Sequence, residues 1–179
     1  MIPEGCRLIE PAEDMAEEYV AYAQEFRDAD EPFIQGELDQ ANGDTPSLIK
    51  QWRDHAAAPN LPEGFVPCSR YWLVRGRRIL ATSRLRHRLT EALEDDGGHI
   101  GYEVRPSERR KGYATCLLAM TLEAARQLGL HRALLTCHVD NLPSRRTIEK
   151  NGGQLASQGI SKRSGQPILR FWIDLRRAR

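Results

Sequence analysis

Apolar residues with a helical period occur in several parts of the chain. The first group has members three or four positions apart: Met15, Tyr19, Tyr22, Ala23 and Phe26. This spacing predicts a helix with one buried face, for which Asp14 is the expected N-cap. A second helix is expected after Ser47, where apolar residues again recur at helical spacing. The intervening residues 28–46 are acidic and contain prolines and glycines, so they are expected to form a loop or short helical turns.

Two further helices are expected in the second half of the chain. Residues 112–128 place apolar side chains on one face and stop before Gly129, a residue type that commonly ends helices. Pro143 suits the first turn of another helix, which should run from about 143 to 151 and end at Gly152 and Gly153.

Runs rich in aromatic and β-branched residues predict strands around these helices. Residues 71–87 form two such runs about Gly76, which is the pattern of a hairpin. The other expected strands are 6–11, 99–104, 132–139, 154–159 and 167–175. A strand, helix, strand crossover therefore lies at the centre of the chain. This order favours an α/β fold with one mixed sheet, helices on both faces, and a single domain over residues 1–179.

Composition narrows the class of protein. The chain has 179 residues, 40% of them hydrophobic and 28% charged, with no apolar run long enough to span a membrane. No secretory signal is visible at the N-terminus, so a cytoplasmic protein is expected. The four cysteines are widely separated, which favours free thiols in a reducing compartment, although their even number leaves a disulfide pair open. Because no histidine or cysteine has metal-ligand spacing, no metal site is expected.

The net charge of +1 conceals an uneven distribution. Residues 1–64 contain 15 acidic and 4 basic side chains, whereas residues 65–179 contain 10 acidic and 22 basic ones. One interpretation is a solvated surface with two signs of charge. The other is that the basic part binds an anion and the acidic part attracts a cation.

The segment VRPSERRKGYAT, residues 104–115, makes the anion interpretation specific. Three consecutive cations, Arg109 to Lys111, stand between an expected strand and the helix that begins at Gly112. The first N–H groups of a helix lack internal partners and lie at the positive end of its dipole, so they attract anions. Gly112 allows a ligand to approach the backbone closely. The segment therefore predicts a pyrophosphate site, and it matches neither a P-loop nor a dinucleotide fingerprint. By itself, the basic cluster is also compatible with a solvated surface or a nucleic-acid patch.

The same segment resembles the acyl-CoA-binding motif of the GNAT superfamily of N-acyltransferases, V-x-P-x-x-[QR]-x-x-G-x-[GA]. Its defined positions are occupied by Val104, Pro106, Arg109, Gly112 and Ala114. The resemblance extends over about residues 70–175. It continues at Asn141 and Ser144 and at the segment IEKNGG, residues 148–153. The sequence also resembles one branch of the superfamily, a group of predicted acetyltransferases. It implies a mostly antiparallel sheet flanked by helices, whose central strands splay apart to form a slot. Residues 1–66 then form a helical, substrate-side part and residues 67–179 the acyl-CoA-binding core.

The resemblance also implies roles for individual residues. Those expected to bind acetyl-CoA are Tyr102, Val104, Arg109, Arg110, Lys111, Gly112, Tyr113, Ala114, Thr115, Asn141 and Arg145. Backbone groups of residues 110–115 would hold the pyrophosphate, and the edge of the strand at 102–104 would pair with the pantetheine arm. Asn141 would bond that arm, and Arg145 would reach a phosphate.

Catalytic residues are harder to assign, because Ile148 stands where many family members have a tyrosine that protonates the leaving thiolate. Three residues on the preceding strand are candidates: His99 and Glu103, which share one face, and Tyr102. His99 can act as a base at neutral pH, or it can be a structural residue after Gly98. Glu103 can bind a cationic substrate or be solvated, and Tyr102 can donate to the thiolate or serve only in packing.

Two functions are compatible with these residues. The first is transfer of an acetyl group from acetyl-CoA to a primary amine, directly within a ternary complex. The acidic bias of the substrate-side part points to a cationic small-molecule or peptide acceptor. The second is a non-catalytic acyl-CoA-binding or regulatory module, suggested by Ile148. No nucleic-acid or membrane partner is expected, and the protein is expected to be a monomer or a homodimer.

Overall fold

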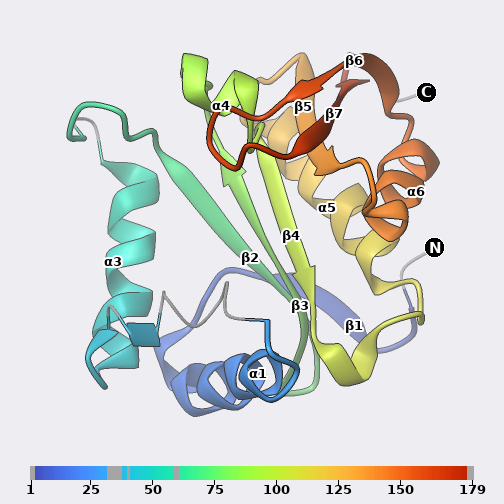
Figure 1. Ribbon diagram of the computed structural model, residues 1–179. Coiled ribbons are helices and arrows are strands. Elements are labelled where there is room, and N and C mark those ends of the chain that lie inside the picture. The colour runs from blue at the N-terminus through green and yellow to red at the C-terminus, as the bar shows by residue number, and fades with distance from the viewer. Residues whose placement is uncertain (1–2, 32–37, 40, 59–60, 177–179) are drawn as a thin grey trace.

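The computed structural model of the protein describes residues 3–31, 38–39, 41–58 and 61–176 (Figure 1). Its strands are β1 (Cys6–Ile9), β2 (Cys68–Arg75), β3 (Arg78–Arg86), β4 (Ile100–Val104), β5 (Arg132–His138), β6 (Gln154–Ile160) and β7 (Pro167–Asp174). Its α-helices are α1 (Ala16–Asp28), α3 (Thr45–Ala57), α4 (Glu91–Asp95), α5 (Tyr113–Gln127) and α6 (Leu142–Lys150). Two 3-10 helices, η1 (Glu13–Met15) and η2 (Pro106–Glu108), precede α1 and the turn before α5.

The starts of the first two helices differ from the expectation. Asp14 does not cap α1: it lies in η1, and its carboxylate accepts a hydrogen bond of 3.0 Å from Arg77. Helix α3 begins at Thr45, before Ser47, because the Asp44 side chain caps the helix by accepting from the Ser47 N–H. Pro46 therefore belongs to the first helical turn, where its missing N–H costs nothing. The rest of the expected loop lies partly outside the described residues, at 32–37 and 40.

The strands form two sheets, whereas one was expected. A four-stranded sheet has the order β1-β2-β3-β4, and a three-stranded sheet has the order β5-β7-β6. Every paired ladder among the described residues is antiparallel. Strands β4 and β5 are the facing edges of the two sheets, and no ladder of the described residues joins them. The fold is thus a mixed α/β arrangement of antiparallel sheets flanked by helices.

Alternation along β2 assigns its two faces to different helices. Trp72 and Val74 pack into a cluster with α1 and α3, while Leu73 between them packs with Tyr113 and Leu117 of α5. Figure 1 shows α1 and α3 on one side of the four-stranded sheet and α5 on the other. A third cluster joins α5, β5, α6 and β7. The two faces of the four-stranded sheet are therefore covered by different helices.

The two sheets meet at His99, the residue before β4. Its backbone N–H donates to the carbonyl of Leu134 on β5 at 2.7 Å, and its Nδ1 accepts from the Leu134 N–H at 2.9 Å. Gly98 has a positive φ of 60°, and a Cβ there would lie 2.4 Å from the Leu134 oxygen. Only glycine fits so close to β5, which explains the residue type at this junction.

Candidate functional site

The turn before α5 has the backbone geometry of an anion site. Arg110 and Gly112 both have positive φ, 62° and 83°, and Gly112 is the N-cap of α5. The first intrahelical hydrogen bond runs from the Cys116 N–H to the Gly112 carbonyl, so the N–H groups of residues 112–115 precede it. A Cβ on Gly112 would meet no atom within 4 Å, so the space in front of this helix end is open.

The cations of the turn are held by carboxylates of the same chain. Arg109 donates two hydrogen bonds to Glu31, of 2.6 and 2.7 Å, and its Nε donates to the Val104 carbonyl. Lys111 donates to Glu108 at 2.8 Å, and Arg110 is exposed. Hydrogen bonding to Arg109 lowers the pKa of Glu31, and hydrogen bonding to Lys111 lowers the pKa of Glu108. Arg109 and Lys111 are therefore each paired with a carboxylate of the same chain.

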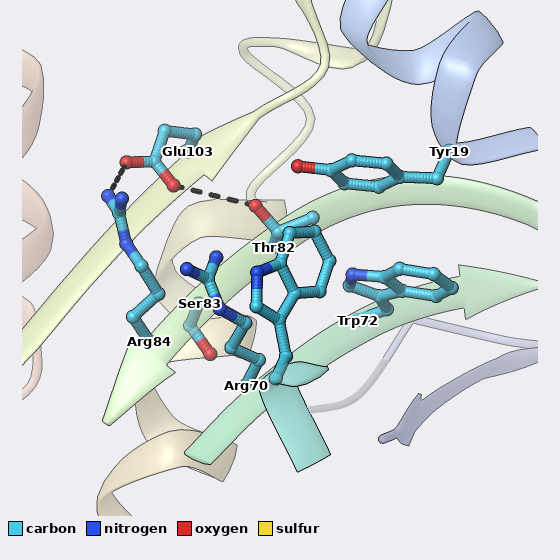
Figure 2. Close-up of a pocket in the computed structure, with 8 residues that line it drawn as sticks. Tyr19, Arg70, Trp72, Thr82, Ser83, Arg84 and Glu103 are labelled. Carbon is cyan, nitrogen blue, oxygen red and sulfur yellow. Dashed lines mark hydrogen bonds and ion pairs between the residues drawn. The ribbon is translucent and has the colours of Figure 1, made fainter. Parts of the chain in front are cut away.

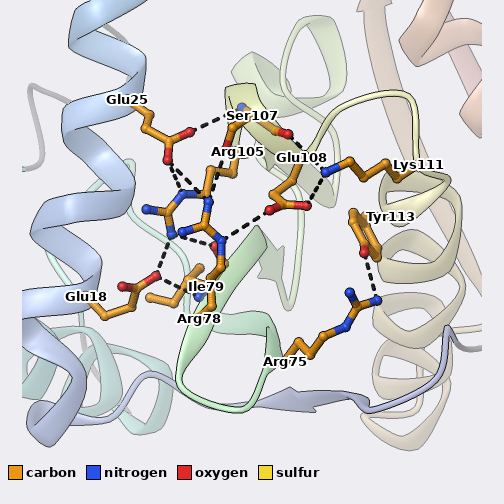
Figure 3. Close-up of polar contacts among 10 residues, drawn as sticks. All are labelled: Glu18, Glu25, Arg75, Arg78, Ile79, Arg105, Ser107, Glu108, Lys111 and Tyr113. Carbon is orange, nitrogen blue, oxygen red and sulfur yellow. Dashed lines mark hydrogen bonds and ion pairs between the residues drawn. The ribbon is translucent and has the colours of Figure 1, made fainter.

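Helix α1 anchors the start of this turn through Arg105 (Figure 3). Arg105 is 3% exposed, and it donates to Glu18 and, at 2.6 Å, to Glu25. Glu25 also accepts from the backbone N–H of Ser107 at 3.2 Å. Burial opposes ionisation of Glu25, but the hydrogen bonds from Ser107 and Arg105 outweigh it and lower the pKa of this carboxyl. A buried arginine satisfied by two carboxylates fixes the backbone that leads into the turn.

At the other end of the turn, Tyr113 is buried at the first position of α5. Its hydroxyl accepts from Arg75 of β2 at 2.9 Å (Figure 3). The half-buried Ala114 and Thr115 follow it in the first turn of the helix. Residues 113–115 are therefore expected to contact an anion through their backbone N–H groups.

Tyr102 connects the edge strand β4 to helix α6. The Tyr102 hydroxyl lies 2.9 Å from Ser144 Oγ and 3.3 Å from the Ser144 carbonyl. Burial raises the pKa of Tyr102 to about 12. Asn141 caps α6 with its Oδ1, which accepts from the Ser144 N–H, and the exposed Arg145 pairs with Glu149 one turn away. Val104 ends β4 and packs half-buried against the α5 cluster.

Glu103 points to the opposite side of β4, into a narrow pocket (Figure 2). Its carboxylate forms an ion pair with Arg84 and accepts from Thr82 Oγ1 at 3.4 Å. The Tyr22 hydroxyl lies 3.2 Å from Thr82 Oγ1 and donates to the Glu103 carbonyl. The residues lining the pocket are Tyr19, Trp52, Arg70, Trp72, Thr82, Ser83, Arg84 and Glu103. The carboxylate is therefore held in place beside aromatic rings and two guanidinium groups.

His99 does not share this pocket with Glu103. Its side chain is 6% exposed, and its Nδ1 accepts the Leu134 N–H between the two sheets. Burial, followed by the charges of Arg86 and Arg132, lowers the pKa of His99 to about 4. The imidazole is thus neutral at pH 7, with Nδ1 already occupied, and this geometry favours the structural alternative for His99 over the role of base.

Ile148 is fully buried in the cluster between α6, β5 and β7. A Cβ on Gly153 would lie 2.4 Å from its side chain, so α6 and the start of β6 close tightly over it. An apolar residue at position 148 therefore completes the core. The hydroxyl groups of Tyr102 on β4 and Ser144 on α6 instead lie 2.9 Å apart.

Sequence patterns alone do not assign the arginines and aromatic residues of the pocket to a site. Arg70 and Trp72 alternate on β2, and Thr82 and Arg84 alternate on β3, so all four share one face of the hairpin. The sequence pattern that could have indicated this pocket is the presence of two arginines on the same strand face as a tryptophan, which the structure buries. The helical spacing of the other aromatic lining residues, on α1 and α3, is equally typical of core packing and does not distinguish a site.

In the part of the chain that the structure describes, four of the 15 acidic residues in 1–64 form ion pairs with arginines of the basic remainder. The pairs are Glu18 and Glu25 with Arg105, Glu31 with Arg109, and Asp14 with Arg77. These pairs join the N-terminal part to the rest of the chain, and a cationic acceptor stays a prediction from the acidic bias.

All four cysteines are free thiols. Within the described residues, no group of three or more His, Cys, Asp or Glu side chains is placed to hold a metal ion. No described helix is long and apolar enough to cross a membrane.

Comparisons with known proteins agree with this geometry. A family model described as an acetyltransferase (GNAT) domain matches residues 7–154. The fold is similar to that of Mycobacterium smegmatis RimJ in complex with CoA-disulfide, with TM-score 0.73, 19% identity, and coverage of 94% of this chain and 81% of that chain. It is also similar to the microcin C7 self immunity acetyltransferase MccE in complex with acetyl-CoA and AMP, with TM-score 0.64, 16% identity and coverage of 97% and 94%.

A third similar structure is a chimera of spermidine N-acetyltransferase SpeG from Vibrio cholerae and hSSAT. Its TM-score is 0.66, with 13% identity and coverage of 96% of each chain. No curated protein sequence matches the chain. At these identities the structures establish the fold, and the fold alone does not select an acceptor.

Proposed function

Because the chain belongs to the GNAT acetyltransferase family, we propose that it transfers an acetyl group from acetyl-CoA to a primary amine. The proposed reaction takes place in a ternary complex. An ammonium acceptor first gives one proton to solvent. The neutral amine nitrogen then attacks the thioester carbonyl, the C–N bond forms as the C–S bond breaks, and the nitrogen loses one proton. The thiolate leaves and takes up one proton to give free CoA.

The observation that carries this proposal is the open helix end at residues 110–115. The N–H groups ahead of its first intrahelical bond, the positive φ of Arg110 and Gly112, and the flanking cations together fit a pyrophosphate. The edge of β4 at Tyr102 to Val104 leads away from this turn and is proposed to hold the pantetheine arm. Asn141 and Arg145, at the start of α6, are proposed to contact the arm and a phosphate.

Direct transfer is favoured over a covalent enzyme intermediate by the state of the thiols near the slot. Burial raises the pKa of Cys137 to about 11 and also raises the pKa of Cys116, so neither thiol is an activated nucleophile. Tyr102 and Glu103 point to opposite sides of β4. Acetyl-CoA and the amine can therefore reach the same strand from two sides, with Glu103 or a water molecule receiving the proton from the amine.

Calorimetry with acetyl-CoA tests the proposed cofactor site. Gly112→Trp fills the space in front of α5, and its matched control is Gly129→Trp at the other end of the same helix. Both glycines have positive φ, 83° and 86°, with no atom within 4 Å of a Cβ. We expect Gly112→Trp to lose at least about tenfold in affinity while Gly129→Trp keeps it. Equal affinity of both folded variants for acetyl-CoA would remove this turn from the site.

A non-catalytic acyl-CoA-binding module is the second candidate, and the buried Ile148 is the observation that favours it. Release of CoA thiol in the presence of a panel of amines separates the two functions, because a module binds acetyl-CoA without amine-dependent release. We further propose that residues 1–179 act as one acetyltransferase domain in a reducing, cytoplasmic compartment, which the four free thiols support.

A further inference from the structure

Strand β6 is an outer edge of the three-stranded sheet (Figure 1). Its seven residues, QLASQGI, include no charged side chain and no proline, the residue types that commonly keep edge strands from pairing. The other sheet edges differ, because β1 contains Arg7 and because β4 and β5 face each other. An uncharged edge of this kind is a template for another strand, since one row of its backbone N–H and C=O groups points outward.

Strand register places the two exposed apolar residues of β6 on one face. Leu155 is opposite Phe171 and Ile160 is opposite Pro167, so both lie on the face that β7 fills with Leu169 and Phe171. Residues five positions apart normally point to opposite faces, and the bulge after Leu155 removes this difference. On β7 this face belongs to the core, whereas Leu155 and Ile160 are 54% and 61% exposed. The apolar face of the small sheet therefore continues onto β6 and is exposed there.

The backbone groups that point away from β7 belong to Gln158 and Ile160. The Ser161 N–H donates to the Gln166 carbonyl at 2.9 Å, and hydrogen-bonded positions alternate along an antiparallel ladder. Residues 159 and 161 therefore bond to β7, and residues 158 and 160 direct their N–H and C=O groups to the open edge. The residue opposite Ile160 is Pro167, which has no N–H to donate, and this agrees with the assignment.

We propose that β6 pairs with β6 of a second copy of this chain, antiparallel and about a twofold axis at Gln158, so that the protein is a homodimer. About this axis the two Gln158 residues exchange both of their backbone hydrogen bonds. Ile160 of one copy then lies beside Leu155 and Ala156 of the other, on the same face. Two three-stranded sheets become one sheet of six strands with a joined apolar cluster.

Charge and symmetry favour a second copy over a strand of another protein. Pairing of residues 154–160 brings no like charges together, and the side-chain amide of Gln158 can both donate and accept across the axis. A charged peptide finds no counter-charge in this strand. Once paired, both β6 edges are used, and since β5 faces β4 in each copy, the assembly stops at two chains. The dimer goes beyond the proposed acetyl transfer and does not depend on it.

Sedimentation equilibrium over about 1–200 µM tests the dimer. We expect the wild type to approach twice the chain mass of 20.3 kDa. Gln158→Pro removes an outward N–H and none of the bonds to β7, so it should fold and stay a monomer. Ile160→Lys, which puts a charge on the apolar face, should raise the dissociation constant of the dimer at least about tenfold. The matched control is Val20→Lys, at a 43% exposed residue of α1, and it should leave this constant unchanged.

Amide hydrogen exchange, measured for each residue by NMR, locates the interface. Where the dimer forms, exchange of the Gln158 and Ile160 N–H groups should slow at least about tenfold, while that of Gly159 and Ser161, already bonded to β7, should not change. A wild type that is monomeric over the whole range overturns the proposal and leaves this edge to a strand of another protein. A dimer that persists in folded Gln158→Pro and Ile160→Lys also overturns it, because the copies then meet elsewhere. If Gln158→Pro does not fold, Ile160→Lys decides, since it changes only an exposed side chain.

Discussion

Neighbouring residues of β4 point to opposite sides of the strand, and this separates the two halves of the proposed reaction. Tyr102 faces α6 and the proposed acetyl-CoA slot, whereas Glu103 faces the narrow pocket on the other side of the strand. With a pKa raised to about 12 by burial, the Tyr102 phenol stays protonated at neutral pH. Full proton transfer from such a weak acid to a thiolate is unfavourable. Its proposed role is therefore to donate a hydrogen bond that stabilises the departing thiolate.

Replacing Tyr102 with Phe tests that role. We expect kcat to fall by about tenfold to a thousandfold, because one donor to developing charge is lost, while KM for acetyl-CoA changes little. The pH–rate profile between about pH 6 and 9 should keep its shape, since a phenol with a pKa of about 12 does not titrate there. Steady-state kinetics and a melting curve for each protein provide the measurements. Full turnover in a folded Tyr102→Phe enzyme would exclude the phenol from the mechanism.

At the level of elements, ion pairs connect α1 and Glu31, which follows it, to the turn before α5. Arg105 ties Glu18 and Glu25 to the start of the turn, and Glu31 binds the guanidinium of Arg109. The Arg105 contacts are buried and structural. The pair of Arg109 and Glu31 is exposed, with side chains 40% and 44% exposed, and an exposed ion pair contributes little to stability. Glu31 therefore competes with any phosphate that binds Arg109.

Glu31→Gln is expected to increase the affinity for CoA by about twofold to fivefold, because it releases Arg109 from an exposed ion pair. Glu17→Gln on α1 makes the same change of charge at an exposed carboxylate and is the matched control. Titration calorimetry at low ionic strength measures both. Weaker binding by Glu31→Gln would show that the carboxylate orients Arg109 for the ligand and does not compete with it.

For the whole molecule, a neutral imidazole makes one of the hydrogen bonds that join the two sheets. His99 accepts the Leu134 N–H, and its pKa of about 4 lies below the ordinary value of 6.5. The unfolded chain therefore binds a proton between these pH values that the folded protein does not. The contribution of His99 to the free energy of unfolding is fully present above about pH 6.5. It is lost as the pH falls to about 4, which lowers the free energy of unfolding by up to about 3 kcal/mol.

Variants at position 99 check this dependence. His99→Ala leaves the buried Leu134 N–H without an acceptor, so the free energy of unfolding should fall by about 1–3 kcal/mol. His99→Asn keeps an acceptor oxygen and should retain more stability, without the loss between about pH 6.5 and 4. Denaturant unfolding at several pH values measures both, and turnover per folded molecule should be preserved in each variant. A large loss of turnover in stably folded His99→Asn would restore His99 as a candidate base.

The sequence by itself determined most of the helices and strands, but not α4 or the starts of α1 and α3, and it contained the acyl-CoA motif that indicates the family. These depend on periodicity and on residues close together in the chain, so a helix such as α5 and the turn at Gly112 are encoded locally. It could not determine the division into two sheets, the structural position of His99 or the pairing of Arg109 with Glu31. Each of these depends on contacts between residues far apart in the chain, such as His99 with Leu134. Only the tertiary structure brings Arg70, Arg84 and Glu103 into one pocket, because strand register and the absence of a side chain at Gly101 decide which charges meet.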